Sequence, residues 1–481
     1  MAKLNNYNGR YCESEYESAF IAFLQSVGWT YLPGNKIKRC YRDVLIADDF
    51  RAFITKANTD LLEEEIEQIY DTVRLVGAES DFATLHKVYK WMVDGIQFTP
   101  QSGLPIQVTL IDFETPENNI FHVVNQLTVD YINNGQRENR RPDVLLYVNG
   151  MPLCIIELKN PADSHSTIYD AWEQITIRYW RDIPHLLHYC PLACISDGVK
   201  TRLGTVRTPY EHFYAWRRAN DADKISTMPF AETETMIKGV YAPERFLEIF
   251  RDYIYFQDEI FDCDEREIVC RYPQFFAARL LKQSIIKSVM EQTGKGGTYF
   301  GATGCGKTYT MAFLARQLSL RCTDIPEIGS PTIVMIVDRD ELQEQGIKLF
   351  AKSKEFLNLG EVSIVKSRNN LRQELGSRES GGFYICTIQK FCDRKEDKIG
   401  LINERHNIIC FSDEAHRTQL EHSRKIQFSK DADENMKAMV SKPYAKVLKE
   451  AFPHATFVGF TGTPIAETYQ TFGDEIDRYT M

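Results

Sequence analysis

Apolar residues in roughly the first hundred positions recur mostly at helical spacing, which predicts an α-helical start to the chain. The first helix is expected over Glu13–Val27, with Gly28 as its stop. Its apolar face is formed by Ala19, Phe20, Phe23 and Leu24. Further helices are expected in an insertion over about 36–102. Strand-like runs then follow over 106–113 and 119–132.

A β-hairpin is predicted by the next segment, RRPDVLLYVNGMPLCIIELKNP. Asn149-Gly150 separates two apolar runs, and both central positions of a type I′ turn require a positive φ, which Asn and Gly accept most readily. The arms of the hairpin are then Asp143–Val148 and Met151–Lys159. A helical pattern over 166–180 and an apolar strand over 192–196 come next.

Three charged residues interrupt this otherwise apolar hairpin. Pairing across the turn places Asp143 opposite about residue 156, within reach of Glu157. Because side chains alternate along a strand, Glu157 and Lys159 share a face. One interpretation is a salt bridge of Lys159 with an acid, although two buried acids and one lysine leave costly negative charge. The other is a divalent metal on the two carboxylates, with Lys159 orienting water beside a phosphate.

The last part of the chain alternates apolar strands with helices. The strand segments are 296–300, 332–338, 382–388, 407–414 and 456–464. This alternation predicts a doubly wound parallel sheet, in which ligands bind at the carboxyl ends of the strands. Polar residues follow each of these strands, so the sequence predicts a binding site along one edge of the sheet.

A phosphate-binding loop is predicted by GATGCGKT, which follows a strand and precedes a helix. Gly301, Gly304 and Gly306 let backbone N–H groups close around phosphates at the positive end of the next helix. Lys307 is expected to reach the outer phosphates of ATP and Thr308 to hold Mg²⁺.

A second acidic cluster, DEAH, follows the strand over 407–411. Asp413 is the expected partner of Mg²⁺, and Glu414 is placed to position or deprotonate the attacking water. Thr461 begins the turn TGTP at the end of a further strand. Its hydroxyl could link the ATP-bound state of the motor to its contact with DNA. GATGCGKT, DEAH and TGTP in this order resemble the first motor lobe of superfamily-two helicases and translocases.

This resemblance extends to three shorter segments. The RYPQ segment before the phosphate loop is similar to the adenine-reading motif of such motors, which implies that Gln274 contacts the base. VDRDELQEQ (Val337–Gln345) and TIQKF (Thr387–Phe391) resemble the segments with which these motors grip a DNA strand.

Pro142-Asp143 with Glu157-Leu-Lys159 resembles the core of PD-(D/E)xK nucleases. That likeness implies that Glu17, on the first helix, completes the metal site of Asp143 and Glu157. Gln174 resembles the first residue of the QxxxY motif of some nuclease families, with a role beside the catalytic residues. Tyr179 lies one residue further than that motif requires, so helix packing is the alternative interpretation for it.

A local basic cluster lies next to this predicted nuclease site. It consists of Arg137, Arg140 and Arg141. These residues could hold DNA phosphates, or they could form a solvated loop.

Composition places the 481 residues among globular proteins, with enough length for two or three domains. The net charge of −10 gives no global support for nucleic acid binding, so any DNA contact must use local patches. No run of eighteen apolar residues is present, and no membrane segment is expected. The twelve cysteines lack paired metal-binding spacings and are interpreted as reduced thiols of a cytoplasmic protein.

A PD-(D/E)xK nuclease followed by a superfamily-two motor resembles the restriction (R) subunit of type I restriction-modification enzymes. The expected organisation is a nuclease domain over 1–215, a linker and helical adapter over 216–260, and a first RecA-like lobe over 261–481. The adapter helix is expected from Pro243 to about Phe256. The resemblance implies ATP-driven translocation on double-stranded DNA, Mg²⁺-dependent cleavage, and assembly with methyltransferase and specificity subunits.

No segment resembling a second motor lobe follows TGTP, so we expect the chain to be an N-terminal portion that does not translocate alone. Two other classes of protein are alternatives. A type III restriction subunit or another defence helicase-nuclease is disfavoured by the order of domains. A non-enzymatic scaffold with degenerate sites is disfavoured by the intact acidic and lysine residues of both sites.

Overall fold

The chain forms two compact units, Met1–Arg271 and Tyr272–Met481, which we call unit 1 and unit 2. The computed structural model describes residues 13–77, 79–101, 103–159, 167–225, 231–257, 265–302, 304–337, 349–350, 354–357, 360, 362–391, 400–413, 415, 426–430, 436–440, 444–463 and 466–480. In this part of the chain, no helix combines the length and apolarity needed to cross a membrane.

Seven strands form the mixed sheet of unit 1, in the order β1-β4-β7-β8-β9-β10-β11. The pairs β1–β4 and β8–β9 are parallel, whereas all other neighbours are antiparallel. The strands are β1 (Thr30–Pro33), β4 (Phe121–Asn125), β7 (Val144–Val148), β8 (Met151–Leu158), β9 (Leu192–Ser196), β10 (Thr201–Thr205) and β11 (Tyr214–Ala215). β7 and β8 are buried along their whole length, as expected of central strands that are covered on both faces.

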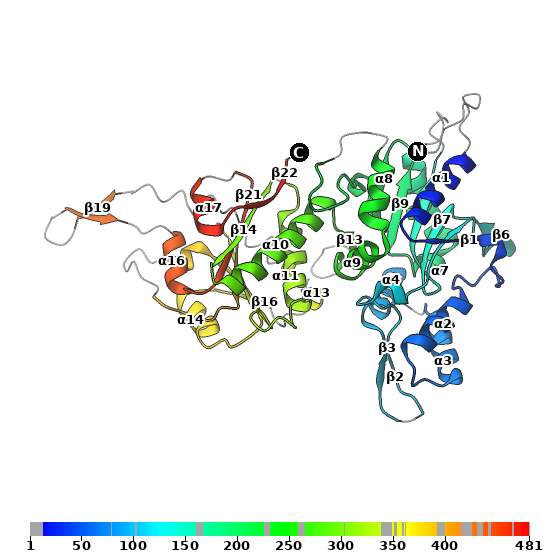
Figure 1. Cartoon of the computed structure of the whole chain (residues 1–481), viewed down its shortest axis with the longest axis horizontal. Coiled ribbons are helices and arrows are strands. Elements are labelled where there is room, and N and C mark those ends of the chain that lie inside the picture. The colour runs from blue at the N-terminus through cyan, green and yellow to red at the C-terminus, as the bar shows by residue number, and fades with distance from the viewer. Residues whose placement is uncertain are drawn as a thin grey trace. The chain divides into compact units, whose positions relative to one another are not determined.

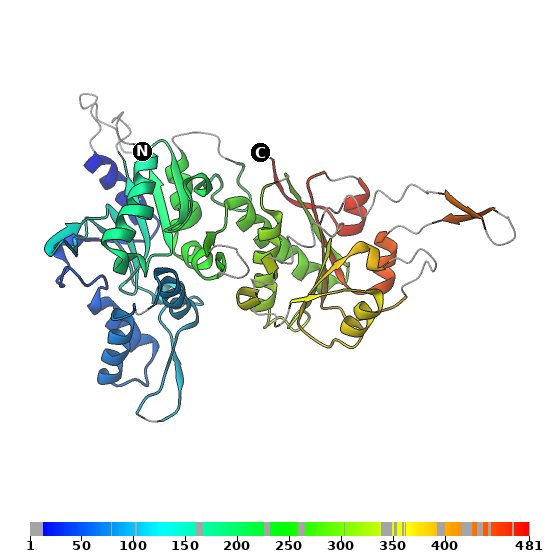
Figure 2. The same cartoon turned by 180° about the vertical axis from the view of Figure 1, so that it is seen from behind.

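The predicted helical start is confirmed. The helices are α1 (Glu13–Ser26), α2 (Ala47–Ala57), α3 (Glu63–Arg74) and α4 (Asp81–Asp94). After them, a thin ribbon of β2 (Ile96–Phe98) and β3 (Ile106–Val108) extends away from α4 (Figures 1 and 2). The strand-like run over 119–132 divides into β4 and β5 (Val129–Asn133), because Gln126 adopts a positive φ of 49° that ends the first strand.

A second group of helices follows the hairpin in unit 1. It contains α5 (Ile168–Glu173), a π-helix over Gln174–Tyr179, α6 (Trp180–Asp182), α7 (Pro184–Leu187), α8 (Glu232–Met236), a second π-helix over Ile237–Tyr241, and α9 (Pro243–Asp252). The predicted adapter helix was too long. Helix α9 ends before Tyr253, and the chain then forms β12 (Ile254–Gln257), which pairs with β13 (Arg266–Val269). The β-branched and aromatic residues of β12 favour a strand over a helix.

Unit 2 contains the predicted parallel sheet, in the order β16-β17-β15-β18-β21-β14-β22. Every neighbouring pair is parallel. The strands are β14 (Lys295–Gly301), β15 (Thr332–Val337), β16 (Val362–Ile364), β17 (Phe383–Thr387), β18 (Ile408–Asp413), β21 (Thr456–Thr461) and β22 (Glu475–Tyr479). The helices are α10 (Tyr272–Glu291), α11 (Lys307–Leu320), α13 (Lys354–Leu357), α14 (Arg368–Gly376), α16 (Tyr444–Ala451) and α17 (Ala466–Phe472), and β19 (Ile426–Lys430) pairs with β20 (Met436–Val440).

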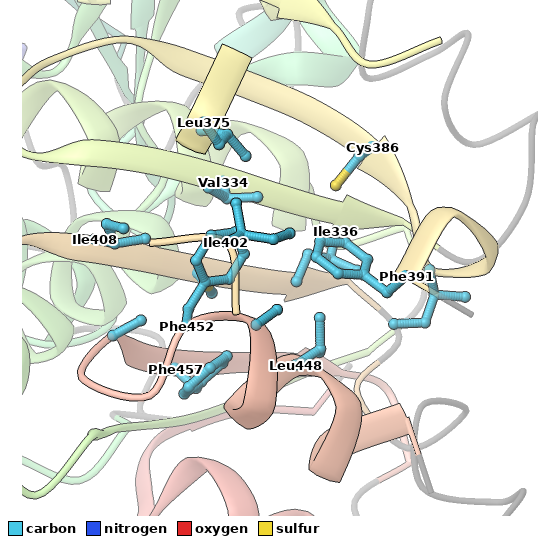
Figure 3. Close-up of a cluster of buried hydrophobic side chains, with 14 of the residues drawn as sticks. Val334, Ile336, Leu375, Cys386, Phe391, Ile402, Ile408, Leu448, Phe452 and Phe457 are labelled. Atoms are coloured by element: carbon cyan, nitrogen blue, oxygen red, sulfur yellow. The ribbon is translucent and has the colours of Figure 1, made fainter. Parts of the chain in front are cut away.

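One face of the unit 2 sheet is covered by an apolar cluster (Figure 3). Val334 and Ile408 of the sheet lie in one buried cluster with Leu375 of α14 and Leu448 of α16. The alternate residues of the same strands, such as Met335, are buried as well. Both faces are therefore covered, which holds the strand ends in fixed positions for the polar residues that follow them.

Two Asn-Gly turns in unit 1 allow a matched test of the hairpin turn. Gly150 and Gly135 both have a φ of 77°. An added Cβ at Gly150 would lie 2.3 Å from the Ile46 carbonyl oxygen, whereas nothing lies within 4 Å at Gly135. Gly135→Ala should lower the free energy of unfolding by about 1 kcal/mol through backbone strain alone. Gly150→Ala should cost about 1–3 kcal/mol more because the backbone must move. Equal losses in denaturant titrations would contradict this packing of the turn.

Candidate nuclease and nucleotide sites

The hairpin turn is confirmed, since Asn149 and Gly150 have φ values of 51° and 77°. The predicted register was wrong by one residue: Val144 pairs with Ile156, which sets Asp143 opposite Glu157. A β-bulge causes the shift, because Leu146 pairs with Cys154 and Tyr147 with Pro152, leaving Leu153 as the extra residue. A proline inside a central strand cannot donate to the ladder, and such prolines occur at bulges. Pro152 is therefore the sequence signal that the prediction overlooked.

The bulge brings Asp143 and Glu157 into direct contact. The Asp143 carboxylate accepts a hydrogen bond from the Leu158 amide at 2.8 Å, and the Asp143 amide lies 3.4 Å from Glu157 Oε1. Glu157 is fully buried, and Asp143 is only 8% exposed. Burial raises the pKa of Glu157 well above its ordinary value, and the negative charge of Asp143 raises it further. Ionisation of both carboxyl groups at once is therefore unfavourable in this buried environment.

Three neighbouring side chains hold Glu157 in place. Tyr179 OH donates to Glu157 Oε1 at 2.7 Å, and Gln174 Nε2 donates to Glu157 Oε2 at 2.8 Å. Lys159 Nζ lies 3.9 Å from Glu157 Oε2 and donates to Gln174 Oε1 at 2.9 Å. Burial, followed by the charge of Glu157, raises the pKa of Tyr179, so its hydroxyl remains a donor. Lys159 therefore faces the acids, as the hairpin pattern predicted.

The extra residue between Gln174 and Tyr179 is absorbed by the π-helix. A π-helix bonds residue i to residue i+5, so residues five apart lie on one face. Gln174 Nε2 lies 2.7 Å from Tyr179 OH, and both side chains reach Glu157. Tyr179 is buried, as the packing interpretation expected, but it also contacts the predicted site directly.

Glu17 lies beside the acid pair and reaches it through a residue that the prediction missed. Gln126 Nε2 lies 2.7 Å from Glu17 Oε2 and 3.2 Å from Asp143 Oδ1, and Asn125 donates to Glu17 Oε1 at 2.5 Å. The left-handed backbone of Gln126 turns its side chain into the site at the end of β4. A glutamine after a strand is a common pattern in sequences, so the sequence alone does not predict that Gln126 links Glu17 to Asp143.

The residues fit a divalent cation by their chemistry. Hard oxygen donors are the ligands that Mg²⁺ prefers, and Asp143 and Glu157 supply them side by side. The charge repulsion that raises the pKa of Glu157 is the repulsion that a cation would relieve. Within the described residues, no three His, Cys, Asp or Glu side chains already form a group suited to a metal ion. Glu17 would have to displace Gln126 to join such a site.

The three arginines next to the site differ in their surroundings. Arg137 forms an ion pair with Asp130. Arg140 Nε donates to Asp182 at 2.8 Å, and its guanidinium lies over the Tyr131 ring. Arg141 is exposed.

In unit 2, the glycine-rich loop connects β14 to α11, which begins at Lys307. Gly304 and Gly306 have positive φ values of 81° and 84°, a backbone conformation that glycine adopts most readily. Lys307 Nζ donates to the Gly301 carbonyl at 3.3 Å, and Thr308 follows it in the first turn of α11. The N-terminus of α11 thus faces the loop, as anion binding requires.

Gln274 of α10 packs against this loop. Its Nε2 atom lies 3.4 Å from the Gly306 carbonyl oxygen, and an added Cβ at Gly306 would come within 2.4 Å of Nε2. The glycine therefore allows the close approach of the Gln274 amide to the predicted phosphate loop.

The other polar clusters lie at neighbouring strand ends. Asp413, at the end of β18, pairs with Phe460, and Thr461, at the end of β21, pairs with Phe300 next to the loop. Asp413, Thr461 and the loop therefore share the carboxyl edge of the sheet. Glu414 lies outside the described residues, as do 338–345 of the predicted DNA-gripping segment.

Together, the units define a class of protein: a mixed-sheet domain of the PD-(D/E)xK type followed by a RecA-like lobe. A family model described as Type I restriction enzyme R protein N terminus matches residues 10–212, and one described as SWI2/SNF2 ATPase matches residues 273–481.

Relatives cover almost the whole chain. It is 31% identical to the type I restriction enzyme HindI endonuclease subunit of Haemophilus influenzae, over 98% of this chain and 44% of that one. It is 28% identical to a candidate type I restriction enzyme endonuclease subunit of Methanocaldococcus jannaschii, over 97% of this chain and 44% of that one. A fragment structure of a candidate HsdR subunit from Vibrio vulnificus matches 74% of this chain and 54% of that one, at 15% identity and a TM-score of 0.25, too low to support any inference. Over almost its whole length this chain is thus similar to R subunits of type I restriction enzymes, and it spans about 44% of the length of these two relatives.

The hydroxyl of Tyr179 can be tested against a matched tyrosine on the same helical segment. Tyr179→Phe removes a donor to buried Glu157, and it should lower the free energy of unfolding by about 1–3 kcal/mol. Tyr169→Phe, at a side chain that is 47% exposed, should change it by less than about 0.5 kcal/mol. Denaturant titrations of both variants measure the difference. A loss for Tyr179→Phe as small as that of the control would leave helix packing as the role of Tyr179.

Proposed function

We propose that this chain provides the nuclease and the first motor lobe of a type I restriction R subunit. Such a subunit would couple ATP-driven translocation on double-stranded DNA to Mg²⁺-dependent cleavage of both strands. The observation that carries the proposal is the pairing of Asp143 with Glu157 next to Lys159 in unit 1, in a chain whose unit 2 has a glycine-rich loop before α11. The matches to both family models and the similarity to type I restriction endonuclease subunits support the same proposal.

In the nuclease site, Asp143 and Glu157 would hold Mg²⁺, with Glu17 as a further carboxylate. The ion supplies a polarised phosphate and a more acidic water when it is bound. Lys159 would orient water or stabilise charge at the scissile phosphate. Gln174 would act as a positioning residue, because it binds both the Glu157 carboxylate and the Lys159 ammonium group.

In the nucleotide site, the backbone amides around Gly301, Gly304 and Gly306 would surround the phosphates of ATP. The Lys307 ammonium group would move from its bond with the Gly301 carbonyl to the outer phosphates.

The remaining predicted groups would complete ATP binding and hydrolysis. Thr308 and Asp413 would hold the Mg²⁺ that accompanies ATP, and Glu414 would position the attacking water. Gln274 lies against the loop and would read the adenine base from α10.

The proposed partners follow from the similarity to type I restriction enzyme subunits. Methyltransferase and specificity subunits would select the DNA sequence, and the assembly would act in the cytoplasm, where it meets incoming DNA. Of the predicted phosphate contacts, Arg141 presents an exposed guanidinium, whereas Arg137 and Arg140 would have to exchange Asp130 and Asp182 for DNA.

The two active sites can be separated in the full-length R protein assembled with methyltransferase and specificity subunits. Asp143→Ala should lower DNA cleavage at least about 100-fold, because a metal ligand is lost, and leave DNA-stimulated ATP hydrolysis intact. Lys307→Ala should abolish ATP hydrolysis and, with it, cleavage that depends on translocation. Asp60→Ala, at an exposed acid of unit 1, is the control and should change neither. Normal cleavage by Asp143→Ala would refute the nuclease assignment.

A further inference from the structure

A small two-stranded ribbon is inserted next to the candidate nuclease site. β5 pairs with β6 (Gln136–Arg140) from Val129↔Arg140 to Asn133↔Gln136. Asn134 and Gly135 close it with φ values of 48° and 77°, the geometry of a type I′ turn. β6 lies at the periphery of unit 1 in both views (Figures 1 and 2).

The base of this β5–β6 ribbon lies in the nuclease site. The chain leaves the site at Gln126 and returns to it at Asp143, and the Gln126 amide donates to the Asp143 carbonyl at 3.0 Å. The Gln126 side chain also binds the Asp143 carboxylate at 3.2 Å. Arg141 precedes Asp143 by two residues, so at most about 7 Å of backbone separates their Cα atoms. A duplex that presents a phosphate to Asp143 would therefore run beside the ribbon.

The ribbon presents amides and guanidinium groups, while its acids are bonded within it. Asp130 pairs with Arg137, and Glu138 accepts hydrogen bonds from Tyr131 OH and Asn133 Nδ2 at 2.5 and 2.9 Å. The exposed residues are Ile132, Asn133, Asn134, Gly135, Gln136, Arg137, Asn139 and Arg141. Residues 129–141 hold three arginines and two acids, a net charge of +1 in a chain whose net charge is −10.

The ribbon is braced on the body of unit 1. Arg140 forms an ion pair with Asp182 of α6 and lies over Tyr131, and the Asp130 amide donates to the Tyr41 carbonyl at 3.0 Å. Arg39 also donates to the Thr128 carbonyl at its base. A ribbon that is already held in place loses little conformational entropy when it binds DNA, which favours binding.

We propose that the β5–β6 ribbon enters the major groove of duplex DNA beside the scissile phosphate. A major groove about 12 Å wide admits a two-stranded ribbon. Arg141 contacts the phosphate next to the one held at Asp143, and the amides at the tip contact base edges without strong sequence preference. The ribbon thereby sets the position of the duplex over the acid pair. This inference rests on the proposed nuclease function and names how its substrate is held.

Binding without cutting tests the ribbon separately from the chemistry. In the Asp143→Ala background, the affinity of the 481-residue chain for a labelled duplex of about 30 base pairs is measured by fluorescence anisotropy across a salt series. Adding Arg141→Ala should weaken binding about 5-fold to 10-fold and reduce the slope of log Kd against log salt by about 1. Lys87→Ala, which removes one exposed positive charge from α4, is the matched control and should change neither.

Crosslinking locates the tip. With p-benzoyl-phenylalanine in place of Asn134, irradiation should attach the duplex to the chain, whereas the same group in place of Lys87 should not. Unchanged affinity of the Arg141→Ala variant, no crosslink from position 134, or no duplex binding by the chain would overturn the ribbon proposal. So would crosslinking from position 134 to a methyltransferase or specificity subunit in the assembled enzyme instead of to DNA. These results leave the nuclease assignment standing if Asp143→Ala still abolishes cleavage, so the two failures are distinguishable.

Discussion

Two carboxylates, those of Asp143 and Glu157, lie together inside unit 1 with a single lysine nearby. Burial of Glu157, followed by the negative charge of Asp143, raises the pKa of Glu157, and hydrogen bonds from Tyr179 and Gln174 hold its carboxyl group in place. Such an arrangement costs free energy in the absence of a cation. The pair lies at the end of a hairpin that is otherwise apolar, and a bound metal ion would offset this cost; the proposed nuclease chemistry depends on that ion.

Each part of the proposed nuclease site depends on a local departure from regular secondary structure. The β-bulge at Leu153 sets the register of the acids, the π-helix aligns Gln174 with Tyr179, and the left-handed Gln126 closes the base of the β5–β6 ribbon. The proposed nucleotide site is formed differently, by residues at the ends of adjacent regular parallel strands. The same chain thus combines a site that depends on irregular backbone with one that follows from a regular sheet.

The sequence was informative where a residue pattern has one physical solution. Asn149-Gly150 specifies a type I′ turn, and alternating strands and helices specify the parallel sheet that aligns Asp413 with the phosphate loop. The predicted register of the hairpin was wrong by one residue, because the bulge depends on how the pairing of β8 with β7 accommodates Pro152. The contact of Tyr179 with Glu157 was not predictable from spacing, because an α-helix and a π-helix place the same residue on different faces. Gln126 was missed because its backbone conformation has no sequence signature.

The most direct measurement is a crystal structure of this chain with Mn²⁺, whose anomalous scattering locates the ion. If the acid pair is a metal site, an anomalous peak will lie between Asp143 and Glu157, within about 2.0–2.3 Å of a carboxylate oxygen of each. The Glu157 carboxylate will then have exchanged one of its protein donors for the ion. A structure in which the ion binds elsewhere, while Asp143 and Glu157 keep only hydrogen bonds to protein groups, would contradict the claim that these acids form a metal-dependent nuclease site.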